Sequence, residues 1–342
     1  MSSAAHRIYF CSGGYEMRPG SVFRKRNREG APVIKKQEFY FESRDREHKI
    51  HAVRWMPETE KPVCIVQIVH GMAEYIDRYD EFAAYLAGKG ILVVGDDHLG
   101  HGKSVLQGGP YGYFCREDAP TVLVRDEHRL KKMTQEQYPG MPYILLGHSM
   151  GSFITRNYLL RYGSGINGAI LVGTGMQSRP LLVCARTLAA LQRIFCGPKH
   201  VSELLNVAAF GGYNKRIRQP NTICDWLSRN EENVRRYIED PLCGFTFTVN
   251  GFQTLFQLIW NLHDEKKLKE MPKRLPVFFI SGEEDPVGNY GQGVLQVYQS
   301  FKKIGMENVQ MKLYPEDRHE LLNEVDRQDV FEDVYRWILQ RI

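Results

Sequence analysis

Short, nearly continuous runs of β-prone apolar residues alternate along this chain with helix-length amphipathic stretches. Five such runs stand out: Val63–Val69, Ile91–Gly95, Tyr143–Leu146, Ala169–Val172 and Val277–Ile280. Strands whose two faces are both covered have this composition. Helices between successive strands supply the crossovers that a parallel sheet needs, and they lie on its faces. The alternation therefore predicts an α/β fold, a mostly parallel sheet with helices on both faces.

The ends of the pattern define the edges of the predicted sheet. Lys36–Glu42 and Lys49–Trp55 alternate apolar and polar residues, which is typical of an antiparallel pair with one face exposed. Val309–Tyr314 is expected to form the last strand. The amphipathic stretches that predict helices are Tyr79–Ala87, Ala119–Gln137, Phe153–Tyr162, Gly293–Ile304 and a closing segment near Arg327–Leu339.

One long segment breaks this rhythm. Residues 176–271 are mainly helical and loop-like in composition and contain no clear buried strand. We interpret them as a helical cap inserted on top of the sheet, with residues 36–175 and 272–342 forming the core domain. Residues 1–35 mix Gly, Ser, Arg and Pro without periodicity, which predicts a poorly ordered N-terminal extension.

Composition excludes several classes of protein. The 342 residues contain 45 Lys and Arg against 40 Asp and Glu, a net charge of +5 that does not call for a nucleic-acid partner. Seven scattered cysteines without a C-x-x-C pair favour neither a disulfide framework nor a zinc site. We find no secretory signal and no apolar run long enough to span a membrane. The sequence therefore predicts a cytoplasmic protein, and it does not predict the oligomeric state.

The most specific motif is Gly147-His148-Ser149-Met150-Gly151, which follows the strand-like segment PYILL and opens a helix. In that context G-x-S-x-G describes a nucleophile elbow, a tight strand-to-helix turn that exposes the serine hydroxyl. The glycines are needed because side chains at their positions would collide with neighbouring elements. The helix N-terminus behind Ser149 offers free N–H groups to a developing oxyanion.

An isolated serine is a weak nucleophile and needs a base that an acid orients. In hydrolases with this elbow the acid and the histidine follow the serine in chain order. Glu283, Glu284 and Asp285 come just after a late strand, and each is a candidate acid. His319 is the only histidine downstream of them, which makes it the candidate base.

The other half of an oxyanion hole is expected in the loop after the third strand. That loop reads His70-Gly71-Met72-Ala73-Glu74. Gly71 allows the backbone to turn so that a following N–H faces the nucleophile, and Met72 is the natural donor.

Taken together, these motifs resemble an α/β-hydrolase of the monoacylglycerol lipase and lysophospholipase branch, which shares a sequence family with certain serine aminopeptidases. The matching pieces, which lie between about residues 36 and 342, are HGMAEYIDRY, DDHLGHGKS, GHSMG, SGEEDPVG and LYPEDRHELLNE. The resemblance implies an α/β-hydrolase fold with a helical cap and no cofactor. It further implies that Ser149 is the nucleophile, His319 the general base and Asp285 the acid, and that the backbone N–H groups of Met72 and Met150 form the oxyanion hole.

A second histidine-rich segment needs a separate interpretation. Asp96-Asp97-His98 and His101 have the composition of a metal site. The resemblance instead makes them part of the loop after the fourth strand, with packing and hydrogen-bonding roles near the site. We therefore predict no bound metal.

Three functions remain to be compared. The first is hydrolysis of a lipid-like carboxylic ester, a monoacylglycerol or a lysophospholipid, through an acyl-enzyme; a generic short-chain carboxylesterase is a variant of it. The second is an aminopeptidase of the proline iminopeptidase type, which would need anionic cap groups to hold a free N-terminus. The third is a non-catalytic binding protein, which the complete catalytic set disfavours. The candidate anionic groups are Glu231, Glu232, Glu239 and Asp240.

The cap sequence bears on the choice of substrate. Leu181–Phe195 is strongly apolar around Arg186 and Arg193. This segment and the apolar stretch after it either pack on the top edge of the sheet or serve the substrate, in which case Leu181–Phe195 forms a lid helix able to touch a lipid surface. A second apolar stretch follows it, and we expect some of its aromatic side chains to line an acyl tunnel. The candidate substrate-binding residues are Phe245, Phe252, Phe256 and Trp260.

Overall fold

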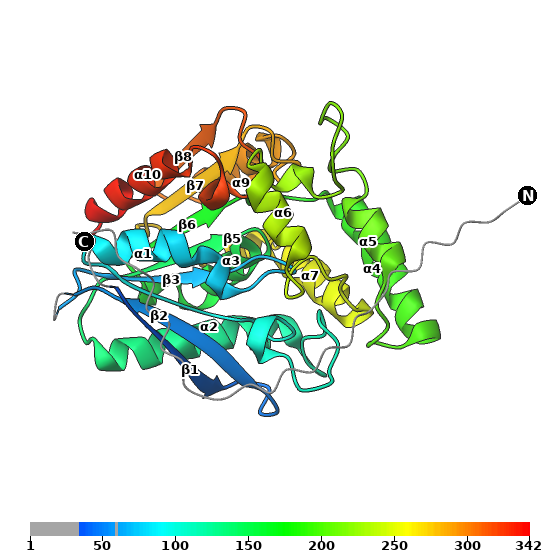
Figure 1. Cartoon of the computed structure of the whole chain (residues 1–342), viewed down its shortest axis with the longest axis horizontal. Helices are drawn as coiled ribbons and strands as arrows, with labels where there is room; N and C mark the ends of the chain where they lie inside the picture. The colour runs from blue at the N-terminus through cyan, green and yellow to red at the C-terminus, as the bar shows by residue number, and fades with distance from the viewer. Residues whose placement is uncertain (1–33, 59–60) are drawn as a thin grey trace, which may run out of the picture. The chain divides into compact units, whose positions relative to one another are not determined.

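The structure is a computed structural model that describes residues 34–58 and 61–342. Its eight strands form one sheet in the order β1-β2-β4-β3-β5-β6-β7-β8 (Figure 1). β1 pairs antiparallel with β2, β2 pairs antiparallel with β4, and all other neighbours are parallel. The predicted fold class is confirmed. The strands are β1 Lys35–Glu42, β2 Lys49–Met56, β3 Ile65–Val69, β4 Leu92–Asp96, β5 Tyr143–His148, β6 Gly168–Val172, β7 Val277–Gly282 and β8 Val309–Tyr314.

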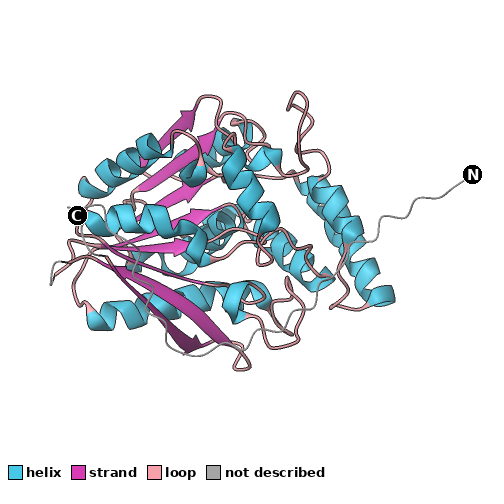
Figure 2. Cartoon of the chain, viewed as in Figure 1, coloured by secondary structure: helices cyan, strands magenta, loops and turns pink. Residues whose placement is uncertain are grey.

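Helices cover both faces of this sheet, as Figure 2 shows. Helices α1 (Asp80–Gly88) and α10 (Arg327–Leu339) lie on one face, where Phe82 and Phe331 pack against each other at 5.0 Å between ring centroids. Helices α2 (Ala119–Gln137), α3 (Met150–Tyr162) and α9 (Gln292–Lys303) cover the other face. Since alternate residues of each buried strand point to opposite faces, each strand contributes to both hydrophobic clusters.

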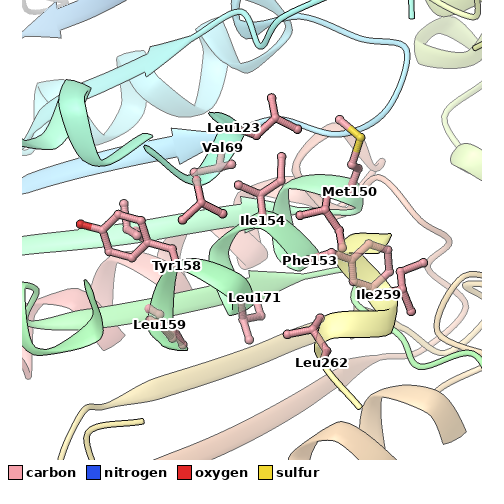
Figure 3. Close-up of a cluster of buried hydrophobic side chains, with 14 of the residues drawn as sticks. Val69, Leu123, Met150, Phe153, Ile154, Tyr158, Leu159, Leu171, Ile259 and Leu262 are labelled. Atoms are coloured by element: carbon pink, nitrogen blue, oxygen red, sulfur yellow. The ribbon is translucent and has the colours of Figure 1, made fainter. Parts of the chain in front are cut away.

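The larger hydrophobic cluster extends from the sheet through α3 into the inserted segment. Figure 3 shows Val69 of β3 and Leu171 of β6 packed against α3 side chains such as Phe153. Ile259, near the end of α7 (Val249–Asn261), and Leu262, directly after that helix, close the same cluster. The inserted segment therefore shares its apolar core with the helix that carries the nucleophile motif.

Five α-helices lie within residues 176–271. They are α4 (Arg179–Cys196), α5 (Glu203–Phe210), α6 (Glu231–Glu239), α7 (Val249–Asn261) and α8 (Glu265–Leu268). α7 packs against α3 and α4, so it lies between the core helices and α4. An isolated bridge, Val201 with Thr248, is the only β-pairing that the structure describes in this stretch.

Several expected boundaries differ from the observed ones, among them those at the starts of β1 and α3. β1 begins at Lys35, so the last residue of the predicted N-terminal extension belongs to the sheet; residues 1–33 of that prediction lie outside the described residues. α3 begins at Met150 rather than at Phe153, because the backbone enters the helix immediately after Ser149. Among the described helices, none is both long enough and apolar enough to cross a bilayer.

Candidate active site

Ser149 occupies a strained turn between β5 and α3. Its backbone has φ 54° and ψ −119°, a conformation that a non-glycine residue rarely adopts and that often marks a functional position. A Cβ at Gly151 would lie 1.9 Å from the Val69 carbonyl oxygen, and one at Gly147 would lie 2.3 Å from Thr155 Oγ1. The two glycines therefore let the turn press against β3 and α3, and the Ser149 side chain is left partly exposed.

His319 and Asp285 form a buried pair at the same edge of the sheet. His319 Nδ1 lies 3.0 Å from Asp285 Oδ2, and both side chains are almost fully buried. Asp285 is held in turn by the Val287 N–H, at 2.8 Å from Oδ1, and by the Ser281 hydroxyl, at 3.2 Å from Oδ2. Glu283 and Glu284 are exposed. Of the three candidate acids, only Asp285 therefore contacts the His319 imidazole.

The elbow reaches the His319 loop through His148. His148 Nε2 lies 3.2 Å from the His319 carbonyl oxygen, and the two rings are 4.8 Å apart. Within the described part of the chain, no hydrogen bond joins the Ser149 hydroxyl to the His319 ring, and catalytic hydrogen bonds are often long or misaligned until substrate binds. Because Asp285 engages Nδ1, Nε2 of His319 is the nitrogen available to a nucleophile.

The loop after β3 leaves the Met72 N–H unused within the described structure. The Gly71 N–H donates to Glu74 Oε1 at 2.6 Å, and the Ala73 N–H donates to His101 Nε2 at 3.3 Å. Among the described residues the Met72 N–H has no acceptor, and the same holds for the Met150 N–H at the start of α3. An ideal Cβ on Gly71 would lie 3.1 Å from Ser149 Cβ, so this loop runs directly beside Ser149.

A buried charge network fixes that loop. Glu74 accepts hydrogen bonds from Tyr79 and Arg78, at 2.8 and 2.9 Å, and pairs with His148 Nδ1 at 3.1 Å. Burial favours the neutral His148 ring, but the hydrogen bond and charge of Glu74 outweigh it and raise the pKa of His148. Arg78 also binds Glu320, the residue after His319, through both terminal nitrogens, at 2.6 and 2.7 Å. This network joins the elbow, the loop after β3 and the His319 loop.

The loop after β4 has the hydrogen-bonding role that the resemblance implies. Asp97 is buried and accepts hydrogen bonds from the Ile76 and Lys103 N–H groups and from His51 Nδ1, at 2.8 to 2.9 Å. His101 donates through Nδ1 to the Leu99 carbonyl, which leaves Nε2 as the acceptor for Ala73. Burial and the nearby His98 charge lower the pKa of His101 to about 3, so this ring stays neutral.

Asp96, His98 and Glu127 are buried and close enough together to hold a metal ion. However, His98 Nδ1 lies 3.2 Å from Glu127 Oε1, and Nε2 lies 3.1 Å from the His70 carbonyl oxygen. An imidazole with an acceptor at each nitrogen carries two protons and has no lone pair for a metal. Burial lowers the pKa of His98, but Asp96 and Glu127 outweigh it and raise that pKa to about 10.

The raised pKa of His98 has a measurable consequence for stability. Because the folded state keeps this proton above the ordinary pKa of 6.5, its stabilising contribution is complete below that pH and is lost as pH rises through about 10. Between pH 7 and 10 the free energy of unfolding of the wild type should fall more steeply than that of His98→Gln, by about 1.4 kcal/mol per pH unit. Urea unfolding at several pH values measures this difference. Parallel pH profiles would show that His98 is neutral.

The candidate substrate-binding residues do not share one environment. Phe252 and Phe256 are buried and pack on each other, with Phe252 also against Phe247. Phe245 is partly buried and contacts His101 at 5.3 Å between ring centroids, beside the loop that carries Met72. The Trp260 ring lies under the Arg186 guanidinium at 4.6 Å. Phe245 is thus the member of the set that lies next to the loop after β3.

Sequence reasoning missed the cap residues that cover His319. The Trp226 ring lies 5.2 Å from the His319 ring and 4.9 Å from the Tyr213 ring. No spacing in the sequence points to them, because the turns between α5 and α6 have no periodic pattern. Glu74 and His148 lie inside motifs that the sequence analysis used, and Glu320 follows His319 directly. Their closeness in sequence to the predicted site residues could therefore have indicated that they lie near the site.

Comparisons with known proteins agree with this geometry. The family model described as serine aminopeptidase, S33, matches residues 60–326. The chain is 27% identical over 292 residues to a monoacylglycerol lipase of Mycolicibacterium smegmatis, covering 84% of this chain and 92% of that protein. It is 26% identical to the human monoglyceride lipase, covering 84% and 86%.

The solved structures give the same picture. A highly thermostable carboxyl esterase from Bacillus coagulans, in complex with glycerol, superposes with a TM-score of 0.84 at 32% identity. That alignment covers 90% of this chain and 99% of the esterase. A monoglyceride lipase from Saccharomyces cerevisiae, at 18% identity and a TM-score of 0.69, shares the fold.

Proposed function

The chain belongs to the serine aminopeptidase S33 family of α/β-hydrolases and is a carboxylic ester hydrolase, and we propose that it cleaves lipid esters with a single acyl chain, monoacylglycerols or lysophospholipids, at Ser149. The observation that carries the proposal is the buried Asp285–His319 pair, at 3.0 Å, beside a serine in a strained elbow. The relatives named as monoacylglycerol and monoglyceride lipases support the choice of substrate.

In this proposal the reaction proceeds through an acyl-enzyme. His319 Nε2 takes the proton of Ser149 as its hydroxyl oxygen attacks the ester carbonyl, and Asp285 stabilises the imidazolium that forms. The Met72 and Met150 N–H groups donate to the oxyanion of the tetrahedral intermediate. His319 then gives its proton to the leaving alcohol. Water attacks the acyl-enzyme by the same route and releases the fatty acid.

Three of the four candidate cap carboxylates, Glu232, Glu239 and Asp240, argue against an aminopeptidase. Glu232 pairs with Arg235 and Arg236 on the exposed surface of α6, and Glu239 pairs with Arg235. Asp240 accepts a hydrogen bond from the Tyr75 hydroxyl at 2.7 Å. Because these groups are already engaged, they are poor anchors for the free amino group of a peptide.

The experiment that tests the proposal is a series of esters from C2 to C16, each measured below its critical micelle concentration. Each methylene that becomes buried contributes about 0.8 kcal/mol, so four extra carbons improve binding by roughly 3 kcal/mol. We therefore expect kcat/KM to rise from short to medium or long chains and then to level off. A maximum at C2–C4 would leave a generic short-chain carboxylesterase.

We include contact with a lipid surface in the same proposal. The outer side of α4 exposes large apolar side chains, among them Ile194 and Phe195, whose exposed fractions are 75% and 82%. Leu204 and Val207 of α5 are also more than half exposed. Contiguous exposed apolar side chains favour a protein or membrane interface. The cytoplasmic location remains a prediction from the sequence.

The surface of α4 can be tested separately from the chemistry. Replacing both Ile194 and Phe195 with serine should lower the rate on monoacylglycerol embedded in vesicles by about tenfold, since apolar area that binds the bilayer is lost. The rate on a monomeric octanoyl ester should not change. Leu295→Ser, which alters an exposed leucine on α9, serves as the control. An equal loss of rate on both substrates would mean that Ile194 and Phe195 maintain the structure of the active site rather than bind the membrane.

A further inference from the structure

A cavity of about 460 Å³ lies where the cap meets the loop after β7. The cap contributes the end of α5 and the turns that follow it, including Gly212, Tyr213 and Lys215, and the core contributes Pro286 and Tyr290. Its volume is in the range of ordinary small-molecule sites. None of the residues that line it is acidic.

The polar groups around this cavity are mainly hydrogen-bond donors with no partner of their own. Within the described residues, the Lys215 ammonium makes no ion pair, and neither the Tyr213 nor the Tyr290 hydroxyl makes a hydrogen bond. The Lys215 side chain folds back over Gly212, since an ideal Cβ on Gly212 would lie 3.5 Å from Lys215 Nζ. The Gly212 N–H also has no acceptor in this part of the chain. An ammonium and a free backbone N–H thus lie side by side.

A second cation strengthens the positive charge of this region. The Arg216 guanidinium stacks on Tyr290, 3.5 Å from the ring centroid, and it too has no ion pair in the described ranges. Cations stacked on an aromatic ring keep their charge and their N–H donors. The cavity therefore offers an environment suited to an anion with several acceptor oxygens.

The cavity adjoins the proposed catalytic groups. Pro286 directly follows Asp285, and the Tyr290 N–H donates to the Asp285 carbonyl oxygen at 2.8 Å. On the cap side, Tyr213 contacts Trp226, and Trp226 contacts His319. Two successive ring contacts thus link the wall of the cavity to His319.

Building on the ester hydrolase function proposed above, we propose that this cavity holds the phosphate monoester of a lysophospholipid, so that the enzyme favours acylglycerol phosphates over neutral monoacylglycerols. Lys215 and the Gly212 N–H bind phosphate oxygens, the tyrosine hydroxyls donate further hydrogen bonds, and Arg216 contributes positive charge. The shared chemistry is a phosphoryl group, whether it belongs to a lipid head group or to free phosphate.

The test compares two monomeric substrates, 1-decanoylglycerol 3-phosphate and 1-decanoylglycerol. The wild type should have a kcat/KM at least tenfold higher for the phosphate ester. Lys215→Gln should lose about tenfold on that substrate alone, the size expected for one charge-assisted hydrogen bond, and stay within twofold on the neutral ester. Lys215→Arg should keep the preference. Lys199→Gln, which changes a cap lysine over the Tyr113 ring, is the matched control and should behave as the wild type does.

Inhibition separates the two sources of phosphate. Glycerol 3-phosphate should inhibit hydrolysis of the neutral ester in the wild type more strongly than inorganic phosphate, and the difference should vanish in Lys215→Gln. Equal inhibition by both would indicate a free-phosphate site and would overturn the head-group proposal. If 1-decanoylglycerol is cleaved without any preference for the phosphate ester, only this inference fails; if neither lipid is cleaved, the proposed function fails first.

Discussion

Ser149→Ala should abolish ester hydrolysis while leaving the fold intact. The side chain lies partly exposed at the start of α3, so removing its hydroxyl leaves no large cavity and breaks no hydrogen bond of the described structure. Because nucleophile and base act as a unit, His319→Ala should lose nearly as much activity, on the order of 10⁶-fold. Steady-state rates on a medium-chain ester and thermal unfolding measure the two effects.

A covalent probe gives an independent readout of the same residue. A fluorophosphonate should label the wild type and fail to label Ser149→Ala, since it reacts only with an activated serine. A second serine offers a control: Ser104, buried and bonded to the Asp97 carbonyl at 2.6 Å, should accept alanine without loss of labelling. Labelling that survives in Ser149→Ala would place the nucleophile elsewhere.

Asp285→Asn should reduce kcat by about 10⁴-fold with little change in substrate binding. The carboxylate accepts from His319 Nδ1 at 3.0 Å, which sets the tautomer that leaves Nε2 free to act as the base. An asparagine held by the Val287 N–H in the same position would turn its amide nitrogen toward the ring and favour the wrong tautomer. Single-turnover rates and KM separate the loss of chemistry from a loss of binding.

The neighbouring carboxylates provide matched controls for this substitution. Glu283 and Glu284 are exposed, so their glutamine variants should stay active within a few-fold of the wild type. If Glu284→Gln were the inactive variant, the acid would be one residue earlier than we propose.

Much of the fold could be predicted because local pattern and global structure agree. The predicted helix Ala119–Gln137 has the observed bounds of α2, since its apolar face and the proline in its first turn define both ends. The strand runs were located to within two residues, because strands buried on both faces leave continuous apolar segments. The start of α3 was misplaced by three residues, because the elbow places Met150 and Gly151 in the helix although neither shows amphipathic periodicity.

The candidate site was only partly readable from the sequence. Ser149 and His319 lie in motifs with fixed order. Chain order alone left three candidate acids, of which the resemblance implied Asp285, and Asp285 is the one that contacts the imidazole. The pairing of Arg78 with Glu320 joins residues 242 positions apart, so no local pattern reveals it. The position of Trp226 over His319 depends on how irregular turns of the cap fold, which hydrophobic periodicity does not describe.

The two halves of the cap are attached to the core in different ways. On the α6 side, Asn233 bonds to both Arg78 and Glu320, and Arg318 donates to the carbonyls of Asp225 and Ser228. On the other side, α4 rests mainly on α7 and carries the exposed apolar surface. Moving α6 would expose unpaired buried charges, whereas moving α4 over α7 would break apolar contacts and two hydrogen bonds, from Arg186 to Gln257 and from Arg193 to Gln253. We therefore expect local opening of this segment to begin at the α4–α5 half and to spare the α6 half.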